Sequence, residues 1–516
     1  MCTCARPWRS WTSMSAPWSA RSGTTPLTRE YPMTLSAASS LPVSDQVPSA
    51  SRSPLHAGLA AELGERHRRR ALYDLGDHPL LERQRQRESN ARSYPRRLPL
   101  ALSRAQGVYV EDVEGRVFLD CLAGAGTLAL GHNHPAVTDV LVRTLHSGLP
   151  LHTLDLTTPV KDRFTQDVLG VLPAAFARHA RVQFCGPTGA DAVEAALKLV
   201  KLATGRGTVL AFQGAYHGMT QGALTLMGNL GPKAALGSSL NGVQFLPYPY
   251  EYRCPFGLGG AAGIAASLAY IDNLLSDPEG GVPKPAAIIV EAVQGEGGMI
   301  PAPVSWLKGL RELATRHDIP LILDEVQTGF GRTGRMFAFE HAGIEPDVLV
   351  LSKALGGGLP LSVVVYHERF DTWRPGAHAG TFRGNQLAMA AGSVTLSVLR
   401  AERLDAAAAE LGARLTAQLA ALARDHACIG DVRGRGLMVG VELVDAAAAP
   451  DALGARPAHR DLAGRVQREC LRRGMIVELG GRHGSVVRFL PPLIITAAQI
   501  DEAARIFGQA LAAASL

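Results

Sequence analysis

Five short apolar runs, separated by helix-like segments, constrain the fold of this chain more than any other feature. Several of them are too uniformly apolar to have a face in water, which is typical of strands in a buried parallel sheet. The alternation predicts an α/β fold in which a large, mostly parallel sheet is sandwiched by helices. The runs are ARVQFC (180–185), GTVLAF (207–212), AAIIVE (286–291), PLILDE (320–325) and DVLVLS (347–352).

A second, smaller α+β unit is expected towards the C-terminus. Beyond about residue 395, an Ala/Leu-rich helical stretch precedes two strand-like segments, VRGRGLMVGVELV (432–444) and SVVRFLPPLII (485–495). Pro491 and Pro492 end the second strand or restrict it to a sheet edge. Near the N-terminus, VYVEDVEGRVFLD (108–120) alternates apolar and polar residues around a turn and predicts a β-hairpin.

Three of the apolar runs end in residues that carry chemistry: Glu291, Asp324 and Lys353. In open parallel sheets, ligands bind beyond the carboxyl ends of the strands. We therefore expect these three side chains to face one cleft. The interval between Asp324 and Lys353 leaves room for one crossover, so their strands are expected to be neighbours.

The pair Asp324 and Lys353 predicts pyridoxal 5'-phosphate (PLP) chemistry. A lysine amine attacks an aldehyde only when deprotonated, and burial lowers its pKa. PLP serves as an electron sink when its pyridine nitrogen stays protonated, which a buried carboxylate such as Asp324 ensures. Gln327 is placed to donate a hydrogen bond to the phenolate oxygen. Taken singly, each residue is an ordinary cap or surface charge; the pair favours the catalytic interpretation.

Two further segments predict cofactor contacts. In GPTGA (186–190), Thr188 begins a helix and forms a capping box with Asp191, which leaves open amides for phosphate at Gly189 and Ala190. The alternative is a capped helix without a ligand. In FQGAYHG (212–218), Tyr216 is expected to stack on the pyridine ring, and His217 beside it is a further expected cofactor contact. Glu291 is expected to contact the cofactor as well. The alternative for Tyr216 is a filler of the core.

Composition narrows the classes of partner. The formal net charge is +6, yet the only dense basic run is RHRRR (66–70), so no nucleic-acid surface is expected. Seven scattered cysteines predict neither a disulfide framework nor a zinc site, and no metal is expected. No apolar stretch is long enough for a membrane span. A reducing, bacterial cytoplasm is therefore expected. Residues 1–54 are interpreted as a disordered extension or as the result of a start codon assigned too early. A transit peptide is the less favoured interpretation of this segment.

Eight motifs in consistent order resemble those of the class III, or ornithine-aminotransferase-like, PLP-dependent aminotransferases. The resemblance covers about residues 100–500 and implies PLP fold type I and a homodimer with shared active sites. It implies that residues 55–125 contribute to the small domain, 126–390 form the large PLP-binding domain and 391–516 the C-terminal small domain. The motifs are LGHNHP (130–135), GPTGADAVEAALKL (186–199), AYHG (215–218), VEAVQGEGG (290–298), LDEVQTGFGRTG (323–334), LSKALGGGLPLS (351–362), GTFRGNQLAM (380–389) and RFLPPL (488–493).

The resemblance also implies roles for three residues outside the apolar runs. Thr381 is similar to the threonine that reaches the phosphate held by the other subunit. Arg488 resembles the arginine that binds the α-carboxylate of 2-oxoglutarate or glutamate, with Glu296 as the gate that pairs with it when the donor has no carboxylate there. The alternatives are a domain-spanning salt bridge for Arg488 and a solvent-exposed loop acid for Glu296.

Within the family, GTFRGNQLAMAAG (380–392) and GAGTLAL (124–130) most resemble enzymes that act on L-2,4-diaminobutyrate. The resemblance thus implies transfer of its terminal amine to 2-oxoglutarate, giving L-aspartate 4-semialdehyde and L-glutamate. Ornithine or 4-aminobutyrate as donor is the alternative, followed by an intramolecular aminomutase. A PLP-binding regulator fused to a DNA-reading domain is a further alternative, but the N-terminal tail offers too little patterned sequence for a helix-turn-helix.

Overall fold

The computed structural model describes residues 54–234 and 242–515 of the chain. The predicted disordered or misassigned extension, residues 1–54, therefore lies outside the described residues except for Pro54. The helices of eight or more residues are α1 (Pro54–Arg68), α2 (Pro79–Arg87), α5 (Pro135–His146), α6 (Pro159–Gly170), α8 (Gly189–Thr204), α11 (Gly260–Ser276), α12 (Val304–Arg316), α13 (Gln386–Ala401), α14 (Leu404–Leu422), α15 (Arg460–Arg472) and α16 (Ala497–Ala514). Shorter helices are α3 (Tyr94–Arg97), α4 (Ala123–Gly126), α7 (Ala174–Ala177), α9 (Gln221–Thr225) and α10 (Leu230–Lys233), with 3₁₀ turns η2 (Glu251–Arg253), η3 (Ala338–His341), η4 (Lys353–Gly356) and η5 (Glu368–Phe370).

A seven-stranded central sheet contains all five apolar runs. Its strands in spatial order are β4 (Ala180–Phe184), β12 (Val363–His367), β11 (Val348–Leu351), β10 (Leu321–Asp324), β7 (Ala287–Val290), β5 (Val209–Phe212) and β6 (Val243–Leu246). β12 is antiparallel to both of its neighbours, whereas the other pairs are parallel. The prediction of a mostly parallel sheet is confirmed, although β6 and β12 were not among the predicted strands.

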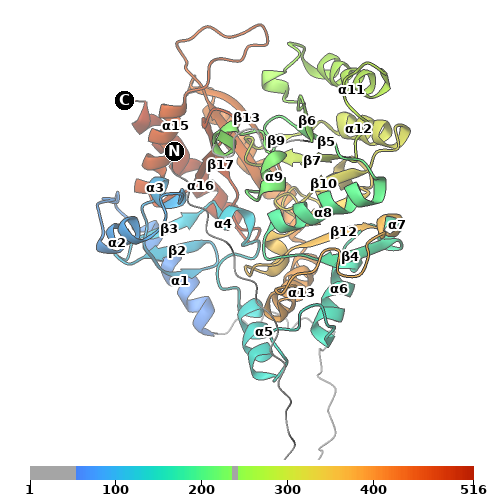
Figure 1. Cartoon of the computed structure of the whole chain (residues 1–516). Helices are drawn as coiled ribbons and strands as arrows, with labels where there is room; N and C mark the ends of the chain where they lie inside the picture. The colour runs from blue at the N-terminus through green and yellow to red at the C-terminus, as the bar shows by residue number, and fades with distance from the viewer. Residues whose placement is uncertain (1–53, 235–241, 516) are drawn as a thin grey trace, which may run out of the picture. The chain divides into compact units, whose positions relative to one another are not determined.

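Alternating side chains of the central sheet pack against helices on its two faces. Leu321 and Leu323 join the core with α6, α12 and α13, whereas Ile322 between them packs with α8 and α9 on the other face. This alternation follows from the two-residue period of a strand. Figure 1 shows α8 in front of the central sheet, where it contacts β11 and β12. With both faces covered, polar side chains can reach water or a ligand mainly at the strand ends.

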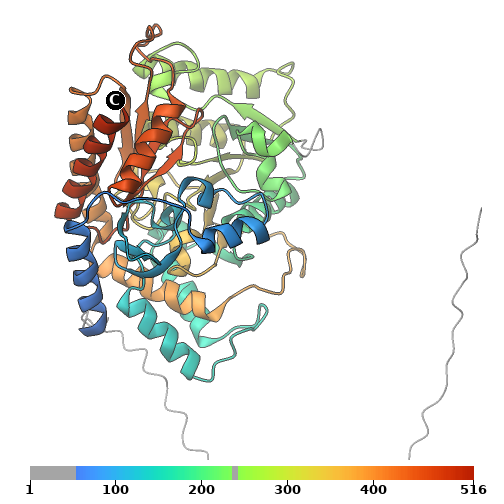
Figure 2. The same ribbon diagram turned by 90° about the vertical axis from the view of Figure 1, so that its left-hand side faces the viewer.

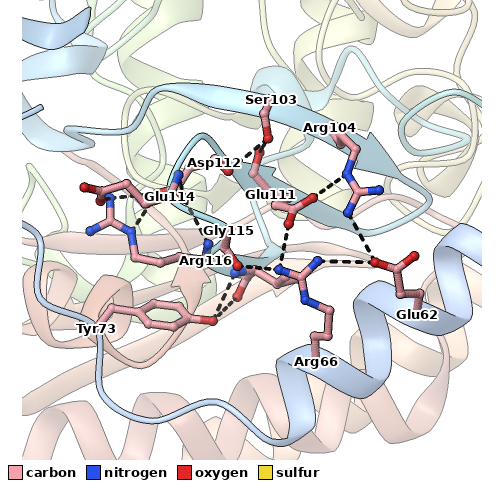
Figure 3. Close-up of polar contacts among 11 residues, drawn as sticks. Glu62, Arg66, Tyr73, Ser103, Arg104, Glu111, Asp112, Glu114, Gly115 and Arg116 are labelled. Atoms are coloured by element: carbon pink, nitrogen blue, oxygen red, sulfur yellow. Dashed lines mark hydrogen bonds and ion pairs between the residues drawn. The ribbon is translucent and has the colours of Figure 1, made fainter. Parts of the chain in front are cut away.

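The predicted hairpin near the N-terminus is confirmed. β2 (Tyr109–Asp112) and β3 (Val117–Asp120) are antiparallel, and the Asp112 carboxylate accepts the amides of Glu114 and Arg116 at 3.0 Å each. β1 (Leu102–Gln106) pairs with β2. The Glu111 carboxylate binds two arginines, one from β1 and one from α1, namely Arg104 and Arg66 (Figure 3). These ion pairs attach α1 to the hairpin.

The two ends of the described chain meet in one sheet. β3 pairs in parallel with β15 (Met475–Ile476), and the amide of Tyr73 donates to the carbonyl of Arg472 at 2.8 Å. Figure 2 shows the blue N-terminal helix α1 beside the orange and red C-terminal segments. A second small sheet contains β13 (Ile429–Arg435), β14 (Met438–Leu443), β17 (Val486–Phe489) and β16 (Glu478–Gly480), and β8 (Val293–Gln294) pairs with β9 (Ile300–Pro301).

Two observations concern the whole described part of the chain. In residues 54–234 and 242–515, no helix combines the length and apolarity that crossing a membrane requires. The cysteines there are free thiols, at positions 121, 185, 254, 428 and 470.

Candidate active site

One cavity of about 650 Å³ lies at the carboxyl ends of the central strands, where both faces of the sheet are already covered. Its wall includes Glu291 after β7, Asp324 at the end of β10 and Lys353 after β11. β10 and β11 are adjacent and parallel, as the spacing of Asp324 and Lys353 predicts. The structure thus brings together the three residues that end the apolar runs.

Lys353 occupies the turn from β11 into η4 with a left-handed backbone, φ 48°. This conformation is uncommon outside glycine and persists where the surrounding structure enforces it, often at functional sites. Burial lowers the pKa of the Lys353 amine, although the charges of Glu296 and Asp324 oppose the shift. A lowered pKa increases the fraction of neutral amine, the form that reacts with an aldehyde.

Asp324 accepts hydrogen bonds from two donors, one to each carboxylate oxygen. His217 Nδ1 lies 2.7 Å from Asp324 Oδ2, and the amide of Val326 donates to Oδ1 at 3.0 Å. Burial opposes the charged form of His217, but the hydrogen bond and charge of Asp324 outweigh it and raise the pKa of His217. The loop after β5 therefore supplies a fully buried histidine that orients the carboxylate.

Glu291, which was predicted as a cofactor contact, connects the loop of Tyr216 to the segment of Gly295 through hydrogen bonds. Its Oε1 accepts the amide of Tyr216 and its Oε2 accepts the amide of Gly295, both at 3.0 Å. Burial, together with the nearby charge of Asp324, raises the pKa of Glu291 to about 7, although His217 opposes the shift. Through this carboxyl group the Tyr216 loop is anchored at the edge of the cavity, which the Tyr216 side chain lines.

The N-terminus of α8 reaches the same cavity with the predicted capping box. Thr188 accepts the amide of Asp191, and the Asp191 carboxylate accepts the amide and hydroxyl of Thr188 at 2.9 and 2.6 Å. A Cβ at Gly189 would approach Val326 to 2.9 Å, so glycine allows this helix end to lie against the segment after β10. Ala190 also lines the cavity. Helix N-terminal amides attract a phosphate group.

Gln327 lines the cavity and is fixed from one side. Its Nε2 donates to the carbonyl of Ala125 at 3.0 Å, which orients the amide and leaves its second N–H for another acceptor. Thr381 is exposed and is not among the residues that line the cavity. Its expected phosphate contact is to the other subunit, so this role stays a prediction.

A bidentate ion pair joins Glu296, which lines the cavity, to Arg488, which is not itself among the lining residues. Arg488 donates from Nη1 and Nη2 to the two carboxylate oxygens of Glu296, at 2.8 and 3.2 Å. The Arg488 side chain is 2% exposed and that of Glu296 37%. Burial opposes ionisation of Glu296, but Arg488 outweighs it and keeps the pKa of this carboxyl group lowered. Among the described residues, none provides a hydrogen-bond partner for Arg488 Nε.

The sequence reasoning missed several residues of the cavity wall, among them Thr127 and Ser352. Ser352 Oγ donates to the carbonyl of Leu361 at 2.9 Å and fixes the turn that carries Lys353. Its position next to the lysine was the available signal. Thr127 lies within GAGTLAL (124–130), a motif that was interpreted only as an indication of substrate preference. Among the described residues, no group of three or more His, Cys, Asp and Glu side chains is placed to hold a metal ion.

The residues of this cavity fit PLP in charge and chemistry. A helix N-terminus with small residues suits the phosphate, the buried Asp324 suits a protonated pyridine nitrogen, and Lys353 supplies an amine for the aldehyde. All three features face one cavity of sufficient size.

The comparisons with known proteins agree with this geometry. Residues 90–511 match the family model for class III aminotransferases. The chain is 61% identical over 422 residues to a diaminobutyrate--2-oxoglutarate aminotransferase of Rhizobium meliloti, which covers 82% of this chain and 90% of the relative. It is 54% identical to the Haemophilus influenzae protein of the same name, over 84% of this chain and 94% of the relative.

The chain is also similar in fold to solved structures of transaminases. An amine transaminase from an uncultivated Pseudomonas species, in a PLP-bound form, has a TM-score of 0.72 and 30% identity, covering 86% of this chain and 98% of that one. The ornithine aminotransferase of Toxoplasma gondii has a TM-score of 0.70 and 28% identity, covering 84% and 95%.

Proposed function

The chain belongs to the class III aminotransferases, and from this premise we propose that it transfers the terminal amine of L-2,4-diaminobutyrate to 2-oxoglutarate, with PLP as its cofactor. The products are L-aspartate 4-semialdehyde and L-glutamate, and the reaction is reversible. The donor carbon loses its amine and takes a carbonyl oxygen from water, while 2-oxoglutarate takes up the amine and releases its carbonyl oxygen as water. The water consumed in one half-reaction is released in the other, so the exchange balances without a further reactant.

The observation that carries the proposal is the Arg488–Glu296 ion pair, whose Glu296 lies in the cavity wall that also bears Lys353. One cavity must accept a keto acid with a carboxylate beside its reacting carbon, and a donor whose reacting carbon has none. The fork of Arg488 suits a carboxylate when Glu296 moves aside. When the donor is bound, Glu296 returns and keeps the buried guanidinium paired.

The remaining residues have distinct tasks. PLP, when bound, supplies the aldehyde and the electron sink that transamination requires. Lys353 holds the cofactor and moves a proton at the reacting carbon. Asp324, oriented by His217, would keep the pyridine nitrogen of bound PLP protonated, and Thr188, Gly189 and Ala190 would hold its phosphate. Tyr216 would lie against the ring, and Gln327 would donate to the phenolate oxygen.

The preference for diaminobutyrate is supported by the names of relatives at 61% and 54% identity. The runner-up is ornithine, which is longer by one carbon and is the substrate named for a solved neighbour at 28% identity. The difference in identity favours diaminobutyrate.

The proposal includes a homodimer with shared active sites in a bacterial cytoplasm. Support for the dimer comes from the exposed Thr381 and from its neighbour Phe382, which is 76% exposed. The bacterial relatives and the free thiols support a reducing compartment. The proposal also keeps the division into a large domain, 126–390, and a small domain from 55–125 and 391–516, which the β3–β15 pairing supports.

The test is a donor panel with purified holoenzyme and 2-oxoglutarate, in which glutamate formation gives kcat/KM for diaminobutyrate, ornithine, 4-aminobutyrate and lysine. We expect diaminobutyrate to exceed each other donor by at least about 10-fold, since one methylene is worth roughly 1–3 kcal/mol in a fitted pocket. Lys353→Ala provides the background and should form no glutamate. Preference for another donor would refute the substrate assignment, and activity in Lys353→Ala would refute the site.

A further inference from the structure

A left-handed turn of four residues lies beside Gln327, and its conformation has no part in the function described so far. Ala123, Gly124, Ala125 and Gly126 of α4 have φ angles of 49°, 59°, 58° and 92°. This region suits glycine, but it is costly for alanine because of the Cβ atom, and it rarely continues over successive residues. Two alanines in such a run indicate that the surrounding structure imposes the conformation, which is common at functional sites.

Asp120, the last residue of β3, holds the start of this turn. Its Oδ1 accepts the amides of Leu122 and Ala123, at 2.8 and 3.0 Å, and its Oδ2 lies 2.8 Å from His132 Nε2. The Asp120 side chain is 6% exposed. Because Asp120 precedes the turn and His132 follows it, their contact fixes the chain on both sides of the turn.

The turn presents one backbone carbonyl to the wall of the cavity. The Ala125 carbonyl accepts Gln327 Nε2 at 3.0 Å, and Gln327 lines the cavity together with Lys353. A carbonyl accepts only from the N–H end of an amide, so it decides which way the Gln327 amide is oriented. On another side, a Cβ at Gly295 would overlap Gln327 Oε1. The amide is therefore confined between the turn and the segment of Gly295.

We propose that Asp120 is a positioning residue for the cofactor. Through the turn and the Ala125 carbonyl, it orients Gln327 so that the second N–H of the amide is available to the phenolate oxygen of bound PLP. The inference rests on the proposed function, which assigns that contact to Gln327. It adds a residue that touches neither substrate nor cofactor, and each step from Asp120 to the cavity wall is a hydrogen bond or the turn itself.

Removal of the carboxylate should release the turn. In Asp120→Ala, the amides of Leu122 and Ala123 lose their acceptor, and the two alanines of the turn are free to leave the left-handed region. The carbonyl then no longer fixes the Gln327 amide. Asparagine keeps an Oδ1 that can accept both amides, and its NH2 group can donate to a neutral His132 nitrogen. Asp120→Asn is therefore the matched control.

The experiment titrates the absorbance of the cofactor on Lys353 in purified holoenzyme without substrate. A donor to the phenolate oxygen favours the form of the cofactor that has lost its proton, so loss of the donor raises the pH at the midpoint of the titration. We expect Asp120→Ala and Gln327→Ala each to raise this midpoint by roughly 0.5–1 pH unit, as one hydrogen bond implies. Asp120→Asn should keep the wild-type midpoint, and a shift equal to that of Asp120→Ala would overturn the proposal.

A double-mutant cycle decides whether Asp120 acts through Gln327. In a Gln327→Ala background, Asp120→Ala should shift the midpoint no further. Additive shifts, or a wild-type midpoint in Asp120→Ala, would overturn the proposal while the raised midpoint of Gln327→Ala upholds the cofactor contact. An unchanged midpoint in Gln327→Ala would refute that contact in the proposed function and the positioning role with it. Because no amino donor is present, none of these results depends on donor preference.

Amide hydrogen exchange of the apoenzyme gives a readout that needs no cofactor. We expect residues 121–128 to exchange roughly 5- to 10-fold faster in Asp120→Ala and at the wild-type rate in Asp120→Asn. Unchanged exchange in Asp120→Ala would show that the carboxylate does not hold the turn and would overturn the proposal. If Asp120→Ala does not fold, Asp120→Ser retains a hydroxyl that accepts one amide. Its midpoint should rise by less than that of Gln327→Ala, and a wild-type midpoint would overturn the proposal.

Discussion

The two ends of the cavity hold their charges in opposite ways. At the cofactor end, the Asp324 and His217 side chains are 6% and 0% exposed, and both oxygens of Glu291 accept backbone amides. At the substrate end, Glu296 is 37% exposed beside a buried Arg488. The carboxylate oxygens of Asp324 and Glu291 are all hydrogen-bonded inside the protein, whereas the ion pair of Glu296 has one member in contact with solvent.

The difference follows from what each end must do. A cofactor stays through both half-reactions, so buried carboxylates whose oxygens are all hydrogen-bonded hold one geometry throughout. Two substrates alternate at the other end, and an ion pair with one exposed member can open because water or a substrate carboxylate compensates the freed charge. Burial therefore distinguishes positions that are rigid from positions that switch.

The largest expected effect is at the cofactor end. Asp324→Asn removes the carboxylate that faces the pyridine nitrogen and leaves His217 without its anion. We expect kcat to fall about 10³-fold in both half-reactions, since a preorganised charge is worth 10²–10³ in rate. Single-turnover measurements with diaminobutyrate and, separately, with 2-oxoglutarate test this. A loss confined to one half-reaction would contradict a fixed cofactor end.

Arg488→Ala should produce a one-sided effect. We expect kcat/KM for 2-oxoglutarate to fall about 10²-fold, because a charge-assisted bidentate contact is lost, while the donor half-reaction falls only several-fold. Glu296→Gln is the matched variant on the other member of the pair and should lower KM for 2-oxoglutarate, since Arg488 is freed. Equal losses for both substrates in Arg488→Ala would mean that the pair is structural.

The smallest effect concerns the pH dependence of stability. The folded-state pKa of Glu291 is raised from 4.5 to about 7 by burial, so the folded protein binds more protons than the unfolded chain between these values. The stability contributed by this group is present below pH 4.5 and is lost as the pH rises through about 7. Relative to Glu291→Gln, we expect the wild type to lose on the order of 2 kcal/mol over this range.

Urea unfolding at several pH values measures that difference. Glu325, whose pKa burial also raises to about 7, contributes equally in both proteins and cancels. Parallel stability profiles for the two proteins would contradict the prediction, because they would mean that folding leaves the pKa of Glu291 unchanged.

Sequence patterns predicted the parts of this protein that depend on local chemistry. The five apolar runs became strands because their β-branched and aliphatic residues suit a sheet that is buried on both faces. Strand β12, with the sequence VVVYH, carried the same signal but was overlooked. The capping box of Thr188 and Asp191 was predictable because it depends only on residues three apart.

Only the tertiary structure could decide which distant groups meet. The sequence predicted that Asp324 and Lys353 lie at the same edge of the sheet, because the carboxyl ends of neighbouring parallel strands meet there. The contact of His217 with Asp324 and the pairing of Glu478 with Arg488 required folding, because partners that far apart in the chain meet only when the strands have taken their order and register. Local structure follows from residues that are close in the chain, whereas the fixed carboxylates at one end of the cavity and the partly exposed ion pair at the other arise from packing.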